Sequence, residues 1–339
     1  MNSNKSSNTD DKTEKREYLT AVLHAAILIG MGIAAVKYLN GEEVVQAFAT
    51  FNFRLAPFIL LLSLFFLLLK GVRFALLMEP FRGDLPWVTT FKAYVAGQAA
   101  TLLPGGIAAR AGLMKQVNVP VAKSSVAIAF SSMIDQLYFV LGSLTAVLWF
   151  EAARTAALAA LGVVTAVTLI LIIPASRRQL LRAADWLAEK FHIQDKWHTF
   201  VQAVPQVFTW RIMGFSLGIT LLAFAAEVIA LDLATRGVGL ELSYPTVLLG
   251  FFLPTMLGRI LPVPGGVGVT EVSMVGFLAA TSEADPNQLA AAVAIFRVGA
   301  IFFQALVGAV VYFTLWKGKE EAADRGEIKS LKNDLKETA

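Results

Sequence analysis

The chain alternates long apolar runs with short polar links, and the runs have the length of membrane-spanning helices. The stretches "LAPFILLLSLFFLLL" (55–69) and "ALAALGVVTAVTLILII" (157–173) approach the roughly 20 apolar residues that cross a bilayer as a helix. The pattern predicts full spans at about 19–39, 54–78, 120–150, 155–174, 208–234 and 286–316. We therefore expect an all-α integral membrane protein, built as a polytopic helical bundle.

Two further apolar stretches, at about 86–117 and 245–281, are each interrupted by the same tripeptide. The two interruptions are Pro-Gly-Gly and consist of Pro104, Gly105, Gly106, Pro264, Gly265 and Gly266. Proline lacks an amide donor and glycine accepts positive φ, so a single such motif is explained by a tight turn between two ordinary helices. The recurrence favours a re-entrant helical hairpin, which leaves the membrane on the side from which it entered.

The surroundings of the two breaks are also alike, which predicts an internal repeat. Each break precedes a long span that carries one charge: Asp135 lies 31 residues after Pro104, and Arg297 lies 33 residues after Pro264. The first copy covers about 54–150 and the second about 208–316. With hairpins, the copies have opposite orientation. Inverted repeats with broken helices are an architecture of secondary transporters, with the site near the midplane.

The placement of basic residues predicts the topology. With hairpins, the N-terminal tail (1–18), the polar loop 175–207 and the tail 317–339 lie on one side, together with most of the 29 Lys and Arg residues. The other side holds Arg54, Arg154 and Arg236. The positive-inside rule then predicts an inner-membrane protein with both termini cytoplasmic. An alternative topology, in which residues 86–103 and 245–263 cross the membrane fully, places the 175–207 loop outside.

Within that loop, segment 180–200 has the pattern of an amphipathic helix. Leu180, Ala184, Leu187 and Phe191 recur at helical spacing with charges between them. Such a helix is expected to lie on the cytoplasmic headgroup surface.

Composition argues against several other classes of function. The chain has no cysteine, three scattered histidines and no phosphate loop, nucleophile elbow or zinc motif. Its two polar regions are shorter than an ordinary catalytic domain. We therefore expect neither an enzyme nor a bound metal or cofactor. The net charge of +4 is attributed to membrane topology and not to nucleic-acid binding.

Charges at membrane depth supply the candidate functional residues, because each costs about 2.5–3.5 kcal/mol at the centre of a span on insertion scales. Arg73 and Asp232 lie near span ends, where side chains can extend to the headgroups. The remaining candidates for substrate binding are Arg110, Asp135, Glu227, Glu271 and Arg297.

Two interpretations of these charges stay open. Arg110 and Glu271 follow Gly-Gly near the start of a helix, where free amides favour an anion site, and Glu271 is also placed to cap its helix or to accept from a cation. The other interpretation is structural: Asp135 and Arg297 occupy matching places in the two copies and pair with each other to fix helix packing.

The assembled motifs resemble a known family. "LLPGGIAAR", the Asp in "SSMIDQLYF", "PVPGGVGVTE" and the Arg in "AIFRVGAIFFQALVG" are similar to the lysylphosphatidylglycerol synthase transmembrane, or flippase-like, family over about 20–316. The resemblance implies movement of a lipid between leaflets. In two-domain members a synthase domain follows, for which a chain ending at Ala339 has no room, so lipid aminoacylation is not implied.

The functional hypothesis is translocation of a membrane phospholipid or lipid-linked headgroup through a cleft between two inverted repeats. Two alternatives remain: a membrane subunit or docking partner for a separate lipid-modifying enzyme, and a small-solute transporter.

The predicted topology is testable by cysteine labelling, since the natural chain has no cysteine. Lys190→Cys and Arg325→Cys should resist an impermeant thiol reagent in intact cells, whereas Ala153→Cys should react. Labelling of Lys190→Cys in intact cells would contradict the hairpin topology.

Overall fold

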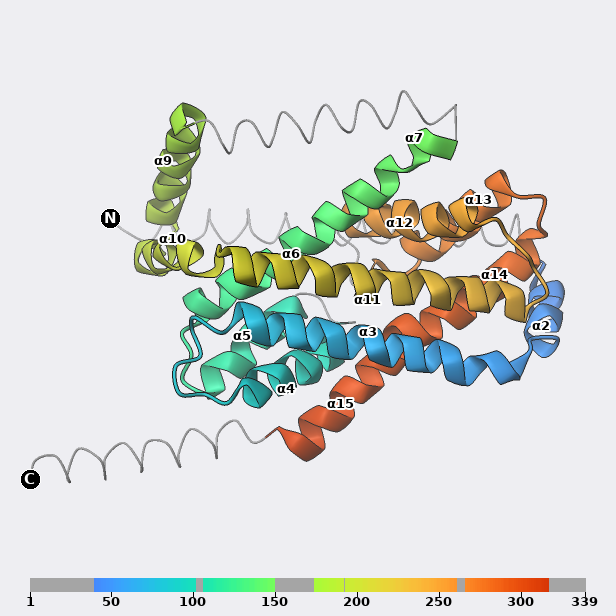
Figure 1. The fold of residues 1–339 in the computed structure, drawn as a ribbon, viewed down its shortest axis with the longest axis horizontal. Coiled ribbons are helices and arrows are strands. Elements are labelled where there is room, and N and C mark those ends of the chain that lie inside the picture. Colours follow the sequence, from blue (N-terminus) through green and yellow to red (C-terminus); the bar gives the residue numbers. More distant parts are fainter. Residues whose placement is uncertain (1–39, 102–105, 150–173, 192, 261–265, 317–339) are drawn as a thin grey trace, which may run out of the picture.

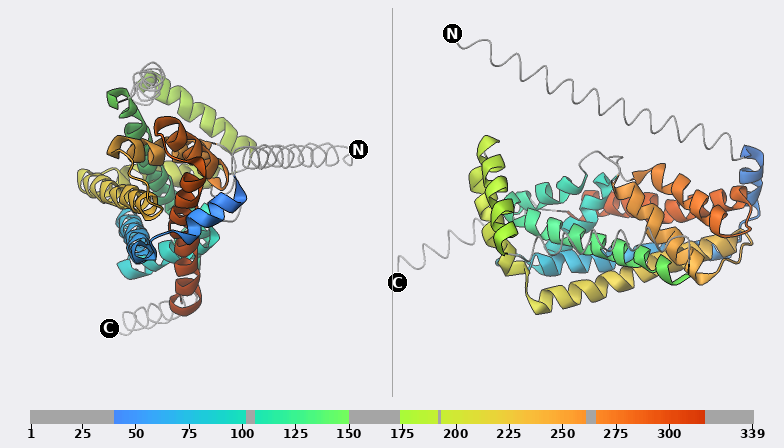
Figure 2. Two further views of the ribbon diagram at one scale, coloured as in Figure 1. Left: turned by 90° about the vertical axis from the view of Figure 1, so that its right-hand side faces the viewer. Right: turned by 90° about the horizontal axis from the view of Figure 1, so that it is seen from above.

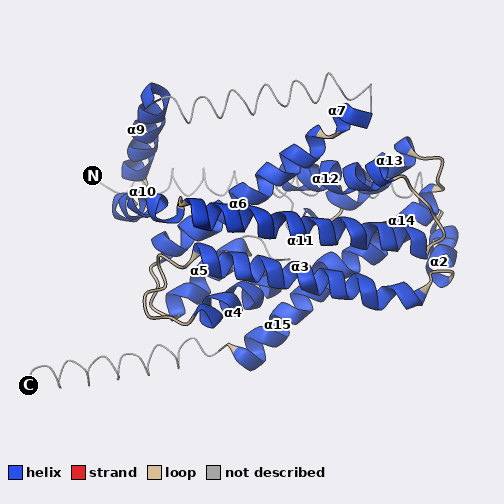
Figure 3. Ribbon diagram, in the orientation of Figure 1, coloured by secondary structure: helices blue, strands red, loops and turns tan. Residues whose placement is uncertain are grey.

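The computed structural model describes residues 40–101, 106–149, 174–191, 193–260 and 266–316, which form helices and connecting loops without any strand (Figure 3). Four helices within them are long and apolar enough to cross a membrane: Phe53–Leu77, Val121–Leu144, Trp210–Gly237 and Pro286–Leu315. These coincide with four predicted spans and confirm the all-α prediction for the described residues. The spans predicted at 19–39 and 155–174, and both tails, lie outside them.

The described helices follow one another along the chain, with the numbering of Figure 1. They are α2 (Gly41–Ala49), α3 (Ala56–Leu77), α4 (Trp87–Gly97), α5 (Ile107–Gln116), α6 (Val121–Leu144), α7 (Ala146–Trp149), α9 (Pro174–Lys190), α10 (Gln194–Val207), α11 (Trp210–Gly237), α12 (Tyr244–Ile260), α13 (Val269–Thr281), α14 (Pro286–Arg297) and α15 (Gln304–Leu315). A π-helical segment, Val298–Phe303, joins α14 to α15.

Each apolar stretch interrupted by Pro-Gly-Gly contains two short helices that pack against each other, α4 with α5 and α12 with α13. The first pair lies toward the end of the bundle that carries α10, and the second toward the end that carries α2 (Figure 1). The re-entry of these pairs into the membrane and the inverted symmetry of the two halves stay predictions.

The glycines of the breaks differ in conformation. Gly266 has a φ of +62°, as expected for a glycine required by its backbone, and a Cβ there would lie 2.9 Å from Thr270 Oγ1. Gly106 has a φ of −53°, so positive φ explains Gly266 but not Gly106. Gly105 and Gly265 lie outside the described residues.

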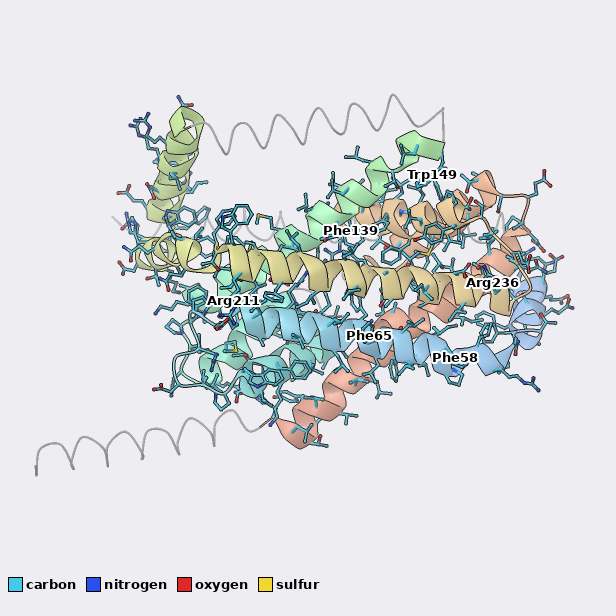
Figure 4. The ribbon with its side chains drawn as sticks, in the orientation of Figure 1. Phe58, Phe65, Phe139, Trp149, Arg211 and Arg236 are labelled. Atoms are coloured by element: carbon cyan, nitrogen blue, oxygen red, sulfur yellow. The ribbon has the colours of Figure 1, made fainter. Side chains whose placement is uncertain are left out.

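Helix α3 has opposite faces suited to lipid and to protein. Phe58, Leu61 and Phe65 are exposed, and Phe58 and Phe65 can be followed in Figure 4. The buried face contains Ile59, Ser63, Leu67, Lys70 and Phe74, which recur every three or four residues. An exposed apolar face together with a partly polar buried face is what a helix needs when its surroundings are hydrocarbon.

The buried apolar side chains form two clusters. The Phe224 cluster includes Phe139, Phe251 and Phe296, and the Phe74 cluster includes Tyr94, Met114 and Phe130. Along α6, Asp135 lies between Phe130 of one cluster and Phe139 of the other; along α11, Thr220 lies between Ile212 and Phe224 in the same way. Polar residues therefore occur where the two clusters adjoin.

The predicted amphipathic segment is helical but forms two helices instead of one. Helices α9 and α10 lie across one end of the bundle, at a steep angle to α3 and α11 (Figure 2). The indole of Trp197 in α10 donates to Asp185 in α9 at 2.6 Å. Trp186, Leu187 and Phe191 are exposed, so an apolar surface is present, and its location at the headgroups stays a prediction.

Gly308 should tolerate substitution poorly, because α15 packs there against backbone. A Cβ at Gly308 would lie 2.6 Å from Ala99 N and 2.7 Å from Val95 O, whereas one at Gly218 in α11 would meet nothing within 4 Å. We expect Gly308→Ala to cost about 1–3 kcal/mol through overpacking, and Gly218→Ala to cost nothing. Thermal unfolding in detergent measures both; equal midpoints would contradict the close approach.

Candidate functional site

Asp135 lies in the middle of α6 and is buried with two cations. Its Oδ1 accepts from Lys70 Nζ and, at 2.6 Å, from Arg73 Nη1. Lys70 and Arg73 are three residues apart in α3 and so share one face of that helix. All three residues are no more than 5% exposed. The carboxylate therefore joins α6 to α3 by a doubly charged contact inside the bundle.

Arg73 extends this contact to a third long helix. Its Nη1 also donates to Thr220 Oγ1 of α11 at 2.6 Å, and its Nη2 donates to Ser131 Oγ at 2.5 Å and to the Ser131 carbonyl at 3.2 Å. A buried charge is tolerated only when it is paired and hydrogen-bonded. Arg73 meets both conditions and holds α3, α6 and α11 together.

The expectation that Arg73 extends to the headgroups is wrong. The side chain is fully buried because it lies on the inward face of α3, about one helical turn after Lys70 and nearly two turns after Leu67. Distance from the span end was the wrong criterion for Arg73. Helical periodicity would have placed both Arg73 and Lys70 on the buried face, and sequence analysis did not single out Lys70 at all. Asp232, by contrast, pairs with Arg236 near the end of α11, and both side chains are partly exposed.

A second polar group connects Arg110 to Glu227 through two glutamines. Arg110 Nη2 donates to Gln98 Oε1 at 2.7 Å, Gln98 Nε2 donates to Gln304 Oε1 at 3.3 Å, and Gln304 Nε2 donates to Glu227 Oε1 at 3.1 Å. The guanidinium only donates and the carboxylate only accepts, so the ends of the chain fix the orientation of both amides. Neither glutamine was singled out from sequence, because a neutral amide gives no charge signal.

The position of Arg110 depends on its neighbours in α4. Its guanidinium carbon lies 4.1 Å from the centre of the Tyr94 ring, a cation–π contact. A Cβ at Gly97 would lie 2.6 Å from Arg110 Cγ, so the glycine leaves room for the arginine stem. Glu227 is 3% exposed, and its Oε2 has no hydrogen-bond partner among the described residues.

Glu271 and Arg297 form the third group. Glu271 Oε1 accepts from Arg297 Nε at 2.5 Å, and Glu271 Oε2 accepts from the Gly268 amide at 2.5 Å. Glu271 therefore caps the start of α13 and also binds a cation, the two roles that its position suggested. The π-helical segment begins directly after Arg297 and ends before Gln304, so it separates this group from the glutamine chain.

The five candidate residues are distributed over these three groups. Asp135 pairs with Lys70 and Arg73, Arg110 and Glu227 are the two ends of the glutamine chain, and Glu271 pairs with Arg297. Asp135 and Arg297 each have other partners, so the alternative in which they pair only with each other does not describe this structure. Among the described residues, no group of three or more His, Asp or Glu side chains is placed to hold a metal ion.

Apolar helices long enough to cross a bilayer, packed around buried charges and amides, define a helical membrane protein. A family model described as the lysylphosphatidylglycerol synthase TM region matches residues 21–308, and the chain belongs to this family. It is also 22% identical over 278 residues to a UPF0104 membrane protein of Methanothermobacter thermautotrophicus, in an alignment that covers 74% of this chain and 80% of the relative. The resemblance expected from the two broken stretches is thereby confirmed.

Asp135→Asn should destabilise the protein strongly. Loss of the carboxylate leaves Lys70 and Arg73 buried without their counter-ion, and breaking a buried pair costs about 3–5 kcal/mol. Asp232→Asn is the matched control, because the Asp232–Arg236 pair is partly exposed and its loss should matter little. Thermal unfolding in detergent compares them, and equal losses would contradict the assigned role of Asp135.

The double variant Asp135→Arg with Arg297→Asp gives a second comparison. It should not recover stability, because each position would face the unchanged partners of the original residue. Recovery to the wild-type midpoint would show that Asp135 and Arg297 act as one pair.

Proposed function

We propose that this protein translocates a lipid, or a lipid-linked headgroup, between the leaflets of the membrane. The supporting observation is that the buried polar groups join residues from both predicted repeats. In the first repeat Arg110 donates to Gln98, and Gln98 in turn donates to Gln304 of the second repeat. Gln304 donates to Glu227, also of the second repeat. A polar headgroup crossing the hydrocarbon region needs partners of this kind, while its acyl chains can stay against the exposed apolar helix faces.

The proposal includes the arrangement that such transport requires. The two halves are inverted repeats with re-entrant hairpins, and the protein is a multi-pass inner-membrane protein with cytoplasmic termini. Its partners are membrane phospholipids or a lipid-linked substrate, and it performs no covalent chemistry. Membership of a family described by a lipid synthase TM region supports a lipid as the transported class.

Transport is tested with the purified protein in liposomes. Fluorescent phosphatidylglycerol in the inner leaflet should become accessible to a membrane-impermeant quencher faster than in protein-free liposomes. If the protein instead supports a separate lipid-modifying enzyme, as the sequence left open, the purified chain moves no lipid alone.

Arg110→Gln should reduce translocation about tenfold or more, the effect of losing about 1.4 kcal/mol of a charge-assisted contact. Arg110 is only partly buried and hydrogen-bonds a neutral amide, so its removal leaves no buried opposite charge directly unpaired and the protein should stay folded. Arg54→Gln, at an exposed position, is the control. Unchanged translocation in folded Arg110→Gln would remove Arg110 from the substrate path.

A further inference from the structure

We infer that Arg259 and Lys70, positioned by Asp135, bind the phosphate group of the transported molecule. The inference rests on the proposed function and specifies the headgroup chemistry that the site recognises. It assigns a role to two basic residues that the five sequence-based candidates did not include.

The charges around Asp135 are unbalanced. Three basic side chains converge on Asp135: Lys70 and Arg73 in direct contact, and Arg259, whose Nη2 lies 3.7 Å from Asp135 Oδ2. The surplus persists over all three groups of the site, in which five basic side chains face three carboxylates. These are Lys70, Arg73, Arg110, Arg259 and Arg297 against Asp135, Glu227 and Glu271. An anionic ligand would offset the surplus.

The three cations around Asp135 differ in what they can still bind. The two terminal nitrogens of Arg73 already donate to Asp135, Thr220 and Ser131, so Arg73 holds the carboxylate in place. Lys70 donates to Asp135 and otherwise faces two aromatic rings, with its Nζ 5.4 Å from the centre of Phe66 and 5.0 Å from that of Phe224. Two of the three ammonium protons of Lys70 have no assigned acceptor among the described residues.

Arg259 is the accessible member of the cluster. Its side chain is 43% exposed, against 4% for Lys70 and none for Arg73. The guanidinium lies over the Phe139 ring, with its carbon 4.7 Å from the ring centre, and it makes no hydrogen bond within the described part of the chain. A ligand therefore meets the donors of Arg259 first, in front of the buried charges of Lys70 and Arg73.

Phosphate is the anion that fits these donors. A guanidinium binds phosphate oxygens in a planar, bidentate manner, and an ammonium adds a point charge beside it. Low local dielectric strengthens the attraction between a buried cation and an approaching anion. The same surplus repels a cationic headgroup, so an amine-bearing lipid would bind here through its phosphate and not through its amine. The phosphate can come from a lipid headgroup or from a free phosphate ion.

The test measures binding to the purified full-length protein in detergent. The probes are fluorescent phosphatidylglycerol, a diacylglycerol with the same acyl chains and no phosphate, and inorganic phosphate as competitor. Wild type should bind phosphatidylglycerol at least about tenfold more tightly than diacylglycerol, a difference of about 1.4 kcal/mol. Arg259→Gln should remove that preference, and Arg259→Lys should keep part of it.

Arg211→Gln is the matched control, because it removes the same charge from an exposed arginine outside the Asp135 cluster. Arg211 lies near the start of α11, and Arg236, near the end of that helix, marks the opposite end of the bundle (Figure 4). It should bind both lipids as wild type does. Equal binding of the two lipids by wild type, or an unchanged preference in Arg259→Gln, would overturn the inference. Binding of inorganic phosphate that phosphatidylglycerol does not displace would also overturn it as a lipid site and identify free phosphate as the ligand.

The result of this binding test can be distinguished from the result of the translocation test. Normal translocation with unchanged phosphatidylglycerol binding in Arg259→Gln refutes the phosphate site alone. A phosphate preference that depends on Arg259, in a protein that moves no lipid in liposomes, supports the site and refutes translocation.

Discussion

A charge inside hydrocarbon must find its counter-charge and its hydrogen bonds within the protein, because no water is available to supply them. The ion pair of Asp135 with Lys70 and Arg73 meets this demand and, in doing so, fixes how three long helices pack. Loss of Asp135 leaves both Lys70 and Arg73 without their counter-ion, so helix packing and the charged site depend on the same contacts. This explains why the paired charges of this site lie inside the bundle, where the two apolar clusters adjoin.

Apolar run length was sufficient to predict the four long helices, because span length depends on bilayer thickness and not on tertiary contacts. The breaks and their flanking helices were also readable, since proline and glycine act locally. The pairing of the charges could not be predicted from the sequence. Arg73 was misjudged by its distance from a span end, and Lys70 was overlooked, although helical periodicity places both on the buried face of α3. Their partners on other helices could not be predicted, because contacts between helices cannot be read from one segment. Gln98 and Gln304 carry no charge and so gave no sequence signal at all.

The three polar groups differ in how rigidly they are held. Arg73 has partners on two other helices, α6 and α11, whereas Arg110 reaches Glu227 only through two amides. The Gln98–Gln304 hydrogen bond is the longest of that chain at 3.3 Å. A π-helical segment lies between Arg297 and Gln304, and such segments are frequent at functional sites. The site thus combines a fixed anchor, around Asp135, with contacts between the halves that consist of single hydrogen bonds.

The glutamine chain also has a consequence for how the sequence can vary in evolution. Each amide presents a donor on one side and an acceptor on the other, so turning both amides over reverses the direction of the chain without moving the backbone. An exchange of charge between its ends, Arg110→Glu together with Glu227→Arg, would therefore leave both glutamines usable. Relatives could therefore carry the opposite charges at these two positions while Gln98 and Gln304 stay unchanged. A joint exchange of charge at positions 110 and 227 among relatives would indicate that the contact itself is retained.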